Sequence, residues 1–241
     1  MTALLAQAGA EVSMTLRRGE SVLLALGIPV LLLGFFSVVD VLPAGDGDPP
    51  VAFLFPGILA LAVMSTAMVS LAIATGFERH YGVLKRLGTT PLGRPRLLMA
   101  KTISVLAVES LQFAVLLGEA KLLGYRPAGA RVAAAALAVV VATVAFAGLG
   151  MLLAGTLPAL TTLAAANALY LVLLLGSGML IPLEELPGGV AAVARLLPSG
   201  ALAEALRATL AGAGVPASAW LVLTGWAVAA PAVAAARFRW E

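Results

Sequence analysis

Six long apolar runs constrain this chain more than any other feature of its sequence. They cover residues 21–41, 51–77, 102–123, 132–156, 161–181 and 217–236. A helix needs about 20 apolar residues to cross the hydrocarbon core of a bilayer, and every run has about that length or more. Pro158 stands between the fourth and fifth runs and predicts a tight turn there. The sequence therefore predicts an all-α polytopic membrane protein with six transmembrane helices in a single domain.

The composition excludes soluble classes of protein. Only 11% of the residues are charged and 61% are hydrophobic, whereas a soluble domain carries about 25% charged residues. The chain has no cysteine and one histidine, His80, which excludes disulfides, thiolate metal sites and sites built from several histidines. We therefore expect no metal and no cofactor in this chain, and no nucleic-acid partner.

The basic residues predict which ends of the spans face the cytoplasm. The N-terminal segment, the 78–101 loop and the C-terminus carry ten of the fifteen Lys and Arg residues. The positive-inside rule places such segments in the cytoplasm, together with both termini. One connection opposes this orientation, because Lys121, Arg126 and Arg131 then lie outside. A composition rich in Ala, Gly, Leu and Arg suggests a GC-rich bacterial genome, so we expect the inner (plasma) membrane of a bacterium.

Two segments are predicted not to span. Residues 1–20 place apolar side chains at near-helical spacing, which predicts a short amphipathic helix in the cytoplasmic interface; a frayed tail is the alternative. Residues 182–215 read as two short amphipathic helices that break at Pro198, with Ser199 as a cap for the second. At about 1.5 Å per residue, neither helix crosses a core of about 30 Å.

For residues 182–215 we therefore expect a re-entrant helical hairpin that enters from the outer face, between the fifth and sixth spans. A pair of helices on the outer surface is the alternative. The residues that define the hairpin by punctuation or charge are Pro182, Glu184, Glu185, Pro187, Pro198, Glu204 and Arg207.

The 78–101 loop carries six basic residues against Glu78 alone. It reads as a helix from Glu78 to Leu87 that ends at Gly88, followed by a turn and a second helix that leads into the third span. Charge alone would also hold such a loop in the cytoplasm and attract anionic lipid.

This loop resembles the cytoplasmic loop of type-2 ATP-binding-cassette (ABC) permeases of the drug- and polysaccharide-export class, which includes daunorubicin-resistance-like membrane subunits. In that family an E-R-x-x-G-x-L-K-R-L…T-P-L-x-R run forms the coupling helix. The matching residues are Glu78, Arg79, Gly82, Leu84, Lys85, Arg86, Leu87, Thr90, Pro91 and Leu92, with Arg94 near the last basic position. His80 and Val83 depart from the pattern. Residues 169–207 are similar to the family's C-terminal signature, a span followed by P-L-E-x-L-P and an E-A-x-R ending, although Ser199 departs from it.

The resemblance implies a permease subunit of an exporter that moves a lipophilic drug, a lipid or a glycan out of the cytoplasm by alternating access. Such permeases are not enzymes themselves. The chain has no G-x-x-x-x-G-K-[ST] phosphate-binding loop, so ATP and Mg²⁺ would be held by a separate nucleotide-binding ATPase subunit. A second permease half, identical or paralogous, is also implied. The residues expected to couple to the ATPase are Glu78, Arg79, Gly82, Lys85, Arg86, Pro91 and Arg94.

The third span carries intramembrane polar residues, which normally face protein or water. Glu109 lies eight residues past Lys101, about 12 Å deep by helix rise. Gln112 and Glu119 are seven residues apart and nearly on one stripe, with Glu109 about 60° away. This polar face would line a cavity or bind a partner helix. Glu119, near the outer end, would alternatively reach the interface or pair with Lys121 or Arg126.

Two other classes of function are alternatives. A proton-coupled secondary transporter would use Glu109 or Glu119 as its proton carrier, but it is expected to show internal repeats, and no clear duplication is present. An intramembrane enzyme is disfavoured, because Ser177 lacks the upstream glycine of a nucleophile elbow and His80 lies at the opposite face.

Overall fold

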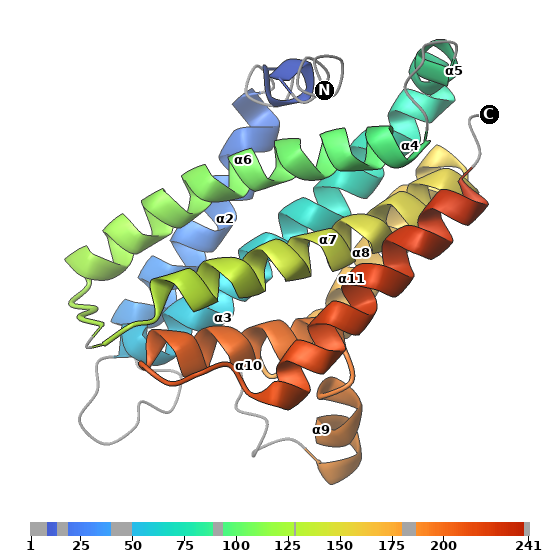
Figure 1. Cartoon of the computed structure of the whole chain (residues 1–241). Coiled ribbons are helices and arrows are strands. Elements are labelled where there is room, and N and C mark those ends of the chain that lie inside the picture. Colours follow the sequence, from blue (N-terminus) through green and yellow to red (C-terminus); the bar gives the residue numbers. More distant parts are fainter. Residues whose placement is uncertain are drawn as a thin grey trace.

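The computed structural model describes residues 9–13, 19–39, 50–88, 94–127, 129–179 and 187–238. All regular secondary structure in these ranges is helical (Figure 1). The elements are a helical stretch at 9–13, then α2 (Gly19–Val38), α3 (Pro50–Met64), the π-helix η1 (Ser65–Ser70), α4 (Leu71–His80), α5 (Val83–Gly88), α6 (Arg94–Leu122), α7 (Val132–Thr156), α8 (Ala159–Leu175), α9 (Gly188–Ala194), α10 (Pro198–Leu210) and α11 (Ala217–Arg237).

Within the described residues, four stretches of helix are long and apolar enough to cross a membrane, and they support a multi-pass membrane protein. These are Pro50–His80, Met99–Leu122, Val132–Thr156 and Ala217–Arg237. Two shorter apolar helices, Ala25–Val38 and Ala159–Leu175, occupy the places of the predicted first and fifth spans. The bent pair α9 and α10 would raise the number of spans to five. Six spans therefore remain a prediction.

The predicted fifth run continues to residue 181, but α8 ends at Leu175. Residues 176–178 form a turn in which Gly178 has a φ of +69°. That backbone conformation suits glycine and ends a right-handed helix. The fifth apolar run is therefore longer than the helix that it forms, because the backbone turns at the glycines that follow Leu175.

Helix α7 lies at the centre of the bundle and contacts α4, α10, α11 and η1 (Figure 1). Two glycines on it allow close approach of neighbouring backbones. A Cβ atom at Gly148 would lie 2.5 Å from the backbone nitrogen of Pro231 on α11, and one at Gly150 would lie 2.7 Å from the carbonyl oxygen of Met68 in η1. Small residues at such crossings let membrane helices pack through their backbones.

Replacing Gly148 by alanine should lower the free energy of unfolding by about 1–3 kcal/mol, because the added methyl group overpacks the crossing of α7 and α11. The measurement is SDS-induced unfolding of the purified protein, followed by circular dichroism. Gly118→Ala is the matched control, since no atom lies within 4 Å of a Cβ atom at that helical glycine. Equal stability of the two variants would contradict the packing argument.

The segment from Glu78 to Gly88 differs from the single helix predicted from Glu78 to Leu87. Helix α4 continues to His80, Tyr81 and Gly82 form a turn, and α5 begins at Val83. Gly82 has a φ of +74°, which breaks the helix at that point. The prediction of one helix is wrong for this reason, and Glu78 belongs to the last turn of α4 instead of the first turn of a separate helix.

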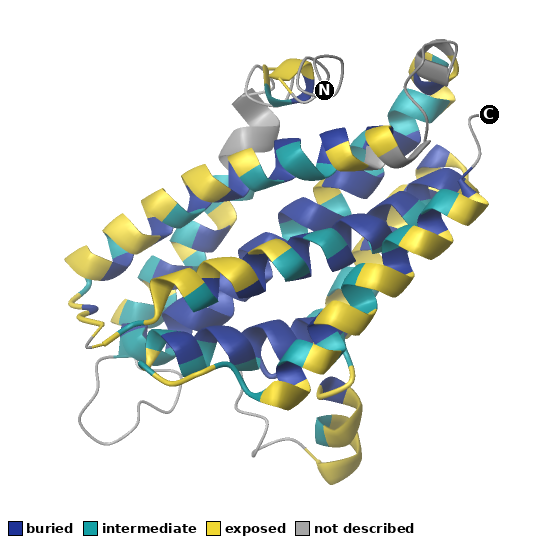
Figure 2. Ribbon diagram, viewed as in Figure 1, coloured by how far each residue is buried: buried dark blue, intermediate teal, exposed yellow. Residues whose placement is uncertain are grey.

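Helices α9 and α10 occupy the described part of the predicted hairpin and meet at an angle of 85°. Figure 2 shows α10 mostly buried and α9 largely exposed. Helix α10 packs against α3, α7 and α11 at the end of the bundle opposite to α5 (Figure 1). Because its neighbours are the long apolar helices, α10 is enclosed within the bundle. The depth of the pair in a membrane stays a prediction.

The predicted cap at Ser199 is wrong. Helix α10 begins at Pro198, with Leu197 at the capping position and no capping side chain. Proline suits the first position of a helix, because the missing N–H would be unpaired there in any case. Ser199 therefore lies inside the first turn, where it is fully buried.

Candidate functional site

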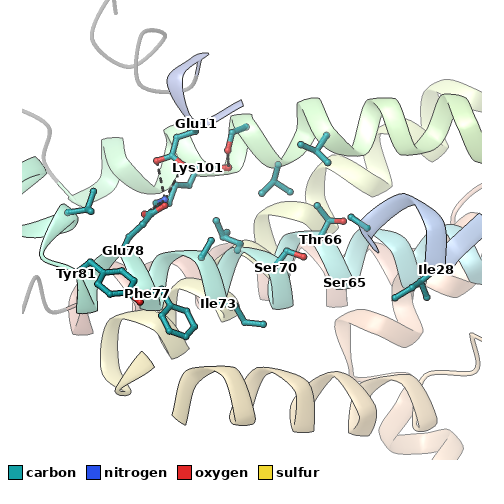
Figure 3. Close-up of a pocket in the computed structure, with 17 residues that line it drawn as sticks. Glu11, Ile28, Ser65, Thr66, Ser70, Ile73, Phe77, Glu78, Tyr81 and Lys101 are labelled. Carbon is teal, nitrogen blue, oxygen red and sulfur yellow. Dashed lines mark hydrogen bonds and ion pairs between the residues drawn. The ribbon is translucent and has the colours of Figure 1, made fainter. Parts of the chain in front are cut away.

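A buried lysine joins three parts of the chain at the α5 end of the bundle (Figure 3). Lys101, near the start of α6, is 1% exposed. Its Nζ donates to Oε2 of Glu78 at 2.7 Å and lies 3.1 Å from Oε1 of Glu11. Glu78 comes from the last turn of α4, and Glu11 from the helical stretch at 9–13. We call these three residues the Lys101 cluster. It ties the N-terminal segment and α4 to α6.

Two of these residues were missed by the sequence reasoning. In the sequence, Lys101 stands among the six basic residues of the 78–101 loop, and Glu11 is one acidic residue of the N-terminal segment. The only signal was that a lysine and a glutamate, Lys101 and Glu78, stand at the two ends of one loop. Such a pair is common on surfaces, where it contributes little.

A cavity of about 720 Å³ begins at the Lys101 cluster and continues between α2, α4, η1 and α6 (Figure 3). Ala25 and Ile28 contribute the α2 wall, and Val105 and Val108 the α6 wall. The remaining side comes from one face of the long helix, on which Thr66, Ser70, Phe77 and Tyr81 succeed one another from η1 to the turn after α4. A volume of this size is typical of sites for small molecules, which hold about 300–1,000 Å³.

The π-helix η1 supplies part of this wall and one of its polar contacts. Thr66 and Gln112 are both buried, and Nε2 of Gln112 lies 2.9 Å from the Thr66 hydroxyl. The same amide nitrogen donates to the carbonyl oxygen of Ala25 at 2.9 Å. Gln112 therefore connects α6 to η1 and α2 by hydrogen bonds. π-Helical turns inside α-helices are frequent at functional sites.

Glu109 faces a different helix from Gln112. It is 1% exposed, and its Oε2 accepts a hydrogen bond from the Thr143 hydroxyl of α7 at 2.6 Å. Its other oxygen, Oε1, has no hydrogen-bond partner among the described residues. Glu109 does not line the cavity. The polar face predicted on the third span is thus divided between two helix interfaces.

Replacing Thr143 by valine should destabilise the protein by about 1–3 kcal/mol, because the buried carboxyl group of Glu109 then loses the hydrogen bond seen here. Thr143→Ser, which keeps the hydroxyl group, is the matched control and should cost less. SDS unfolding of both variants measures the difference. A serine variant as unstable as the valine variant would show that the methyl group, and not the hydrogen bond, matters.

Glu119 lies against α2 near the far end of α6. A Cβ atom at Gly34 would lie 3.1 Å from its Oε1. Its Oε2 has no hydrogen-bond partner within the part of the chain that the structure describes, and no ion pair to Lys121 or Arg126 is found there. The predicted pairing of Glu119 with Lys121 or Arg126 therefore has no support in the described residues.

The predicted coupling residues divide into two groups. The first group lies in the last turn of α4, where Glu78 binds Lys101 and Arg79 donates to the carbonyl oxygen of Leu157. Gly82, Lys85 and Arg86 belong to the turn and to α5, which projects from the bundle (Figure 1). The Lys85 side chain is exposed. Arg94 begins α6, and Pro91 lies outside the described residues.

The hairpin residues are partly described. Arg207 of α10 donates from Nη2 to the carbonyl oxygen of Met179 at 2.9 Å, and its guanidinium lies 4.7 Å from the centre of the Phe53 ring. Glu204 is half-buried on the same helix, and Pro187 precedes α9. These contacts hold α10 against α3 and the turn after α8. Pro182, Glu184 and Glu185 lie outside the described residues.

Ser177, the residue considered for an intramembrane enzyme, is hydrogen-bonded to backbone. Its hydroxyl donates to the carbonyl oxygen of Leu174 at 2.9 Å and accepts from the N–H of Met179 at 3.2 Å. Both bonds stabilise the turn that ends α8. His80 lies on α4 near the opposite end of the bundle (Figure 1).

The comparisons with known proteins point to one class. The family model described as "ABC-2 type transporter" matches residues 6–211. A search of curated proteins gave no match. The matched segment includes the Lys101 cluster, the cavity, α5 and the α9–α10 pair. Because the family match extends over most of its length, the chain belongs to the ABC-2 type transporter family.

Proposed function

We propose that the chain is the permease subunit of an ABC exporter, driven by a separate ATPase subunit that binds ATP and Mg²⁺. The observation that carries this proposal is the family match, together with the short helix α5 that projects from the bundle. The cargo would be a lipophilic drug, a lipid or a glycan, and a second permease half would complete the transporter. The protein would lie in a bacterial inner membrane with both termini in the cytoplasm.

The geometry supports a route for coupling. Helix α5 is joined to α4 by the two-residue turn at Tyr81 and Gly82, and α4 continues through η1 into α3 without a break. Glu78 at the end of α4 is bonded to Lys101 of α6. A movement of α5 would therefore be transmitted to two long helices, and both of them line the cavity. Closure of the ATPase subunits would in this way reach the transport route.

A proton-coupled transporter is the weaker candidate. Its proton carrier would have to be Glu109 or Glu119, yet Glu109 is buried against Thr143 and neither residue lines the cavity. The family match also points to a transporter of the ATP-binding-cassette type.

Purification of the tagged chain from its native membranes tests the proposal. We expect a subunit with a phosphate-binding loop to co-purify in equal amount and to show vanadate-sensitive ATPase activity. Mild crosslinking before solubilisation controls for loss of the subunit in detergent. Recovery of the chain with no ATPase after crosslinking would overturn the proposal.

A further inference from the structure

The charges at one end of the cavity are paired within the chain. Among the described residues that line it, the charged ones are Glu11, Glu78 and Lys101, and aliphatic side chains such as Ile28 and Val108 line its apolar body. Both carboxylates form an ion pair with the Lys101 ammonium group, at 3.1 Å from Glu11 and 2.7 Å from Glu78. A charged guest would lose its hydration here and meet only groups that already have an opposite charge. The lining therefore favours an uncharged guest.

Hydroxyl groups line the cavity beyond these charges. Four of the described lining residues are serine or threonine. The Thr66 hydroxyl is hydrogen-bonded to Gln112, and the Ser104 hydroxyl donates to a backbone carbonyl oxygen of its own helix. The hydroxyls of Ser65 and Ser70 have no hydrogen-bond partner within the described part of the chain. Ser65 is half-buried and Ser70 is exposed, so both hydroxyls can bond to a guest.

The π-helix brings these two hydroxyls to the same cavity. Ser65 and Ser70 are the first and last residues of η1, and the N–H of Leu71 donates to the carbonyl oxygen of Thr66, five residues earlier. In an α-helix, two residues five positions apart point about 140° away from each other. The wider turn of a π-helix, with hydrogen bonds between residues five apart, brings such a pair nearer to one face. The irregular turn therefore builds a pair of hydroxyl groups into the wall.

Aromatic rings continue this wall towards the end of α4 (Figure 3). Phe77 follows Ser70 by seven residues, which places it on nearly the same stripe of the helix and about 10 Å further along. The rings of Phe77 and Tyr81 have centres 6.2 Å apart and planes inclined by 25°. Tyr81 is 71% exposed, so its ring is accessible. Aromatic rings pack favourably against one another, so the wall suits a flat aromatic body with a polar group at one end.

From this arrangement we propose that the cavity binds uncharged aromatic molecules that carry a hydroxyl or carbonyl group, with that group at Ser65 and Ser70 and the aromatic body towards Phe77 and Tyr81. The volume of about 720 Å³ accommodates a molecule of drug size. That such molecules are the transported cargo rests on the proposed function, whereas their binding does not.

The experiment uses the full chain in nanodiscs of phosphatidylcholine, without any ATPase subunit, and four ligands that share the anthracene ring system. Anthracenemethanol is uncharged and carries a hydroxyl group, methylanthracene lacks that group, anthracenecarboxylate is an anion, and anthracenylmethyl-trimethylammonium is a cation. Equilibrium dialysis measures their binding by the fluorescence of the ring system, and empty nanodiscs correct for partition into lipid. We expect saturable binding of anthracenemethanol. Binding of each ion should be at least about tenfold weaker, and binding of methylanthracene about threefold to tenfold weaker.

Variants locate the hydrogen-bonding group. Replacing Ser65 and Ser70 together by alanine should weaken binding of anthracenemethanol about threefold to tenfold and leave that of methylanthracene unchanged, since only the first ligand has a group to lose. Unchanged binding of methylanthracene also shows that the variant is folded. Ser110→Ala is the matched control, because Ser110 is an exposed serine of α6 that does not line the cavity. If the double variant fails to fold, Ser70→Ala alone decides, because Ser70 is exposed.

Binding of either ion as tight as that of anthracenemethanol, absence of saturable binding of anthracenemethanol, or an unchanged affinity for it in the serine variants would each overturn the inference. These outcomes are separate from the failure of the proposed function. Binding of anthracenemethanol without any ATPase partner would retain the site and remove the exporter, while an ATPase partner without such binding would do the reverse.

Discussion

Replacement of Lys101 by methionine will lower the free energy of unfolding by about 3–5 kcal/mol, the largest stability effect we expect from one substitution. The lysine is buried and contacts the carboxylates of Glu11 and Glu78. Methionine keeps much of the side-chain volume but removes the ammonium group that both carboxylates contact. Removing one partner of a buried ion pair is costly, because the remaining charge stays out of water.

A triple variant separates this charge effect from packing. Lys101→Met combined with Glu11→Gln and Glu78→Gln removes all three charges, and it should recover most of the lost stability, since a buried ion pair contributes little over uncharged groups of similar shape. Lys121→Met is the control for loss of a lysine, because Lys121 is exposed at the other end of α6. SDS unfolding of the purified wild-type protein and of these three variants measures the differences. A triple variant as unstable as Lys101→Met alone would show that the lysine acts through packing.

Reversal of the charge at Lys85 will reduce the amount of co-purified ATPase subunit by at least about tenfold, since a like charge placed in a matched interface costs several kcal/mol. Lys85 is exposed on α5, the helix that we propose as the docking element. The expected result for Lys85→Glu is a folded permease without its partner. Its measurement is the ratio of the two subunits after purification and the vanadate-sensitive ATPase activity of the sample.

The choice of Lys85 follows from the structure. The Lys85 side chain is exposed, whereas Glu78 and Arg79 make part-buried hydrogen bonds to Lys101 and to the backbone of Leu157 that a charge reversal would break. Lys121→Glu, an exposed lysine at the opposite end of the bundle, is the matched control and should keep the partner. If both Lys85→Glu and Lys121→Glu retained the ATPase subunit in full amount, the proposal that α5 docks this subunit would be wrong.

The long helices could be predicted closely because their signal is local. The uncharged run at 132–156 coincides with α7, which Arg131 precedes and Pro158 follows. The run at 217–236 becomes α11, which ends one residue later at Arg237. The length of an apolar run and the charges that flank it act on each helix by itself, so the sequence is sufficient to predict where these two helices begin and end. The turn at Gly82 could not be predicted in this way. A glycine within a helical pattern can continue the helix or end it, and the positive φ that ends α4 here is seen only in the structure.

The polar contacts depend on distances that no local pattern contains. Glu109 and Gln112 are three residues apart and were expected to share one face, yet the first bonds to α7 and the second to η1 and α2. Helical periodicity gives the angle between two side chains, but the neighbouring helices decide what each one meets. The hydrogen bond between Lys101 and Glu11 shows this more clearly, because the two residues are ninety positions apart in the sequence.

The sequence by itself determined that this is a helical membrane protein of the ABC-2 type, because apolar runs of spanning length and the motifs of the 78–101 loop are both read along the chain. Only the tertiary structure decided that Glu78 neutralises a buried lysine, that α10 is enclosed by its neighbours, and that a cavity with an ion-paired end lies between α2, α4 and α6. The physical reason is that a charge or a void is defined by everything packed around it, and packing brings together residues that are distant in sequence.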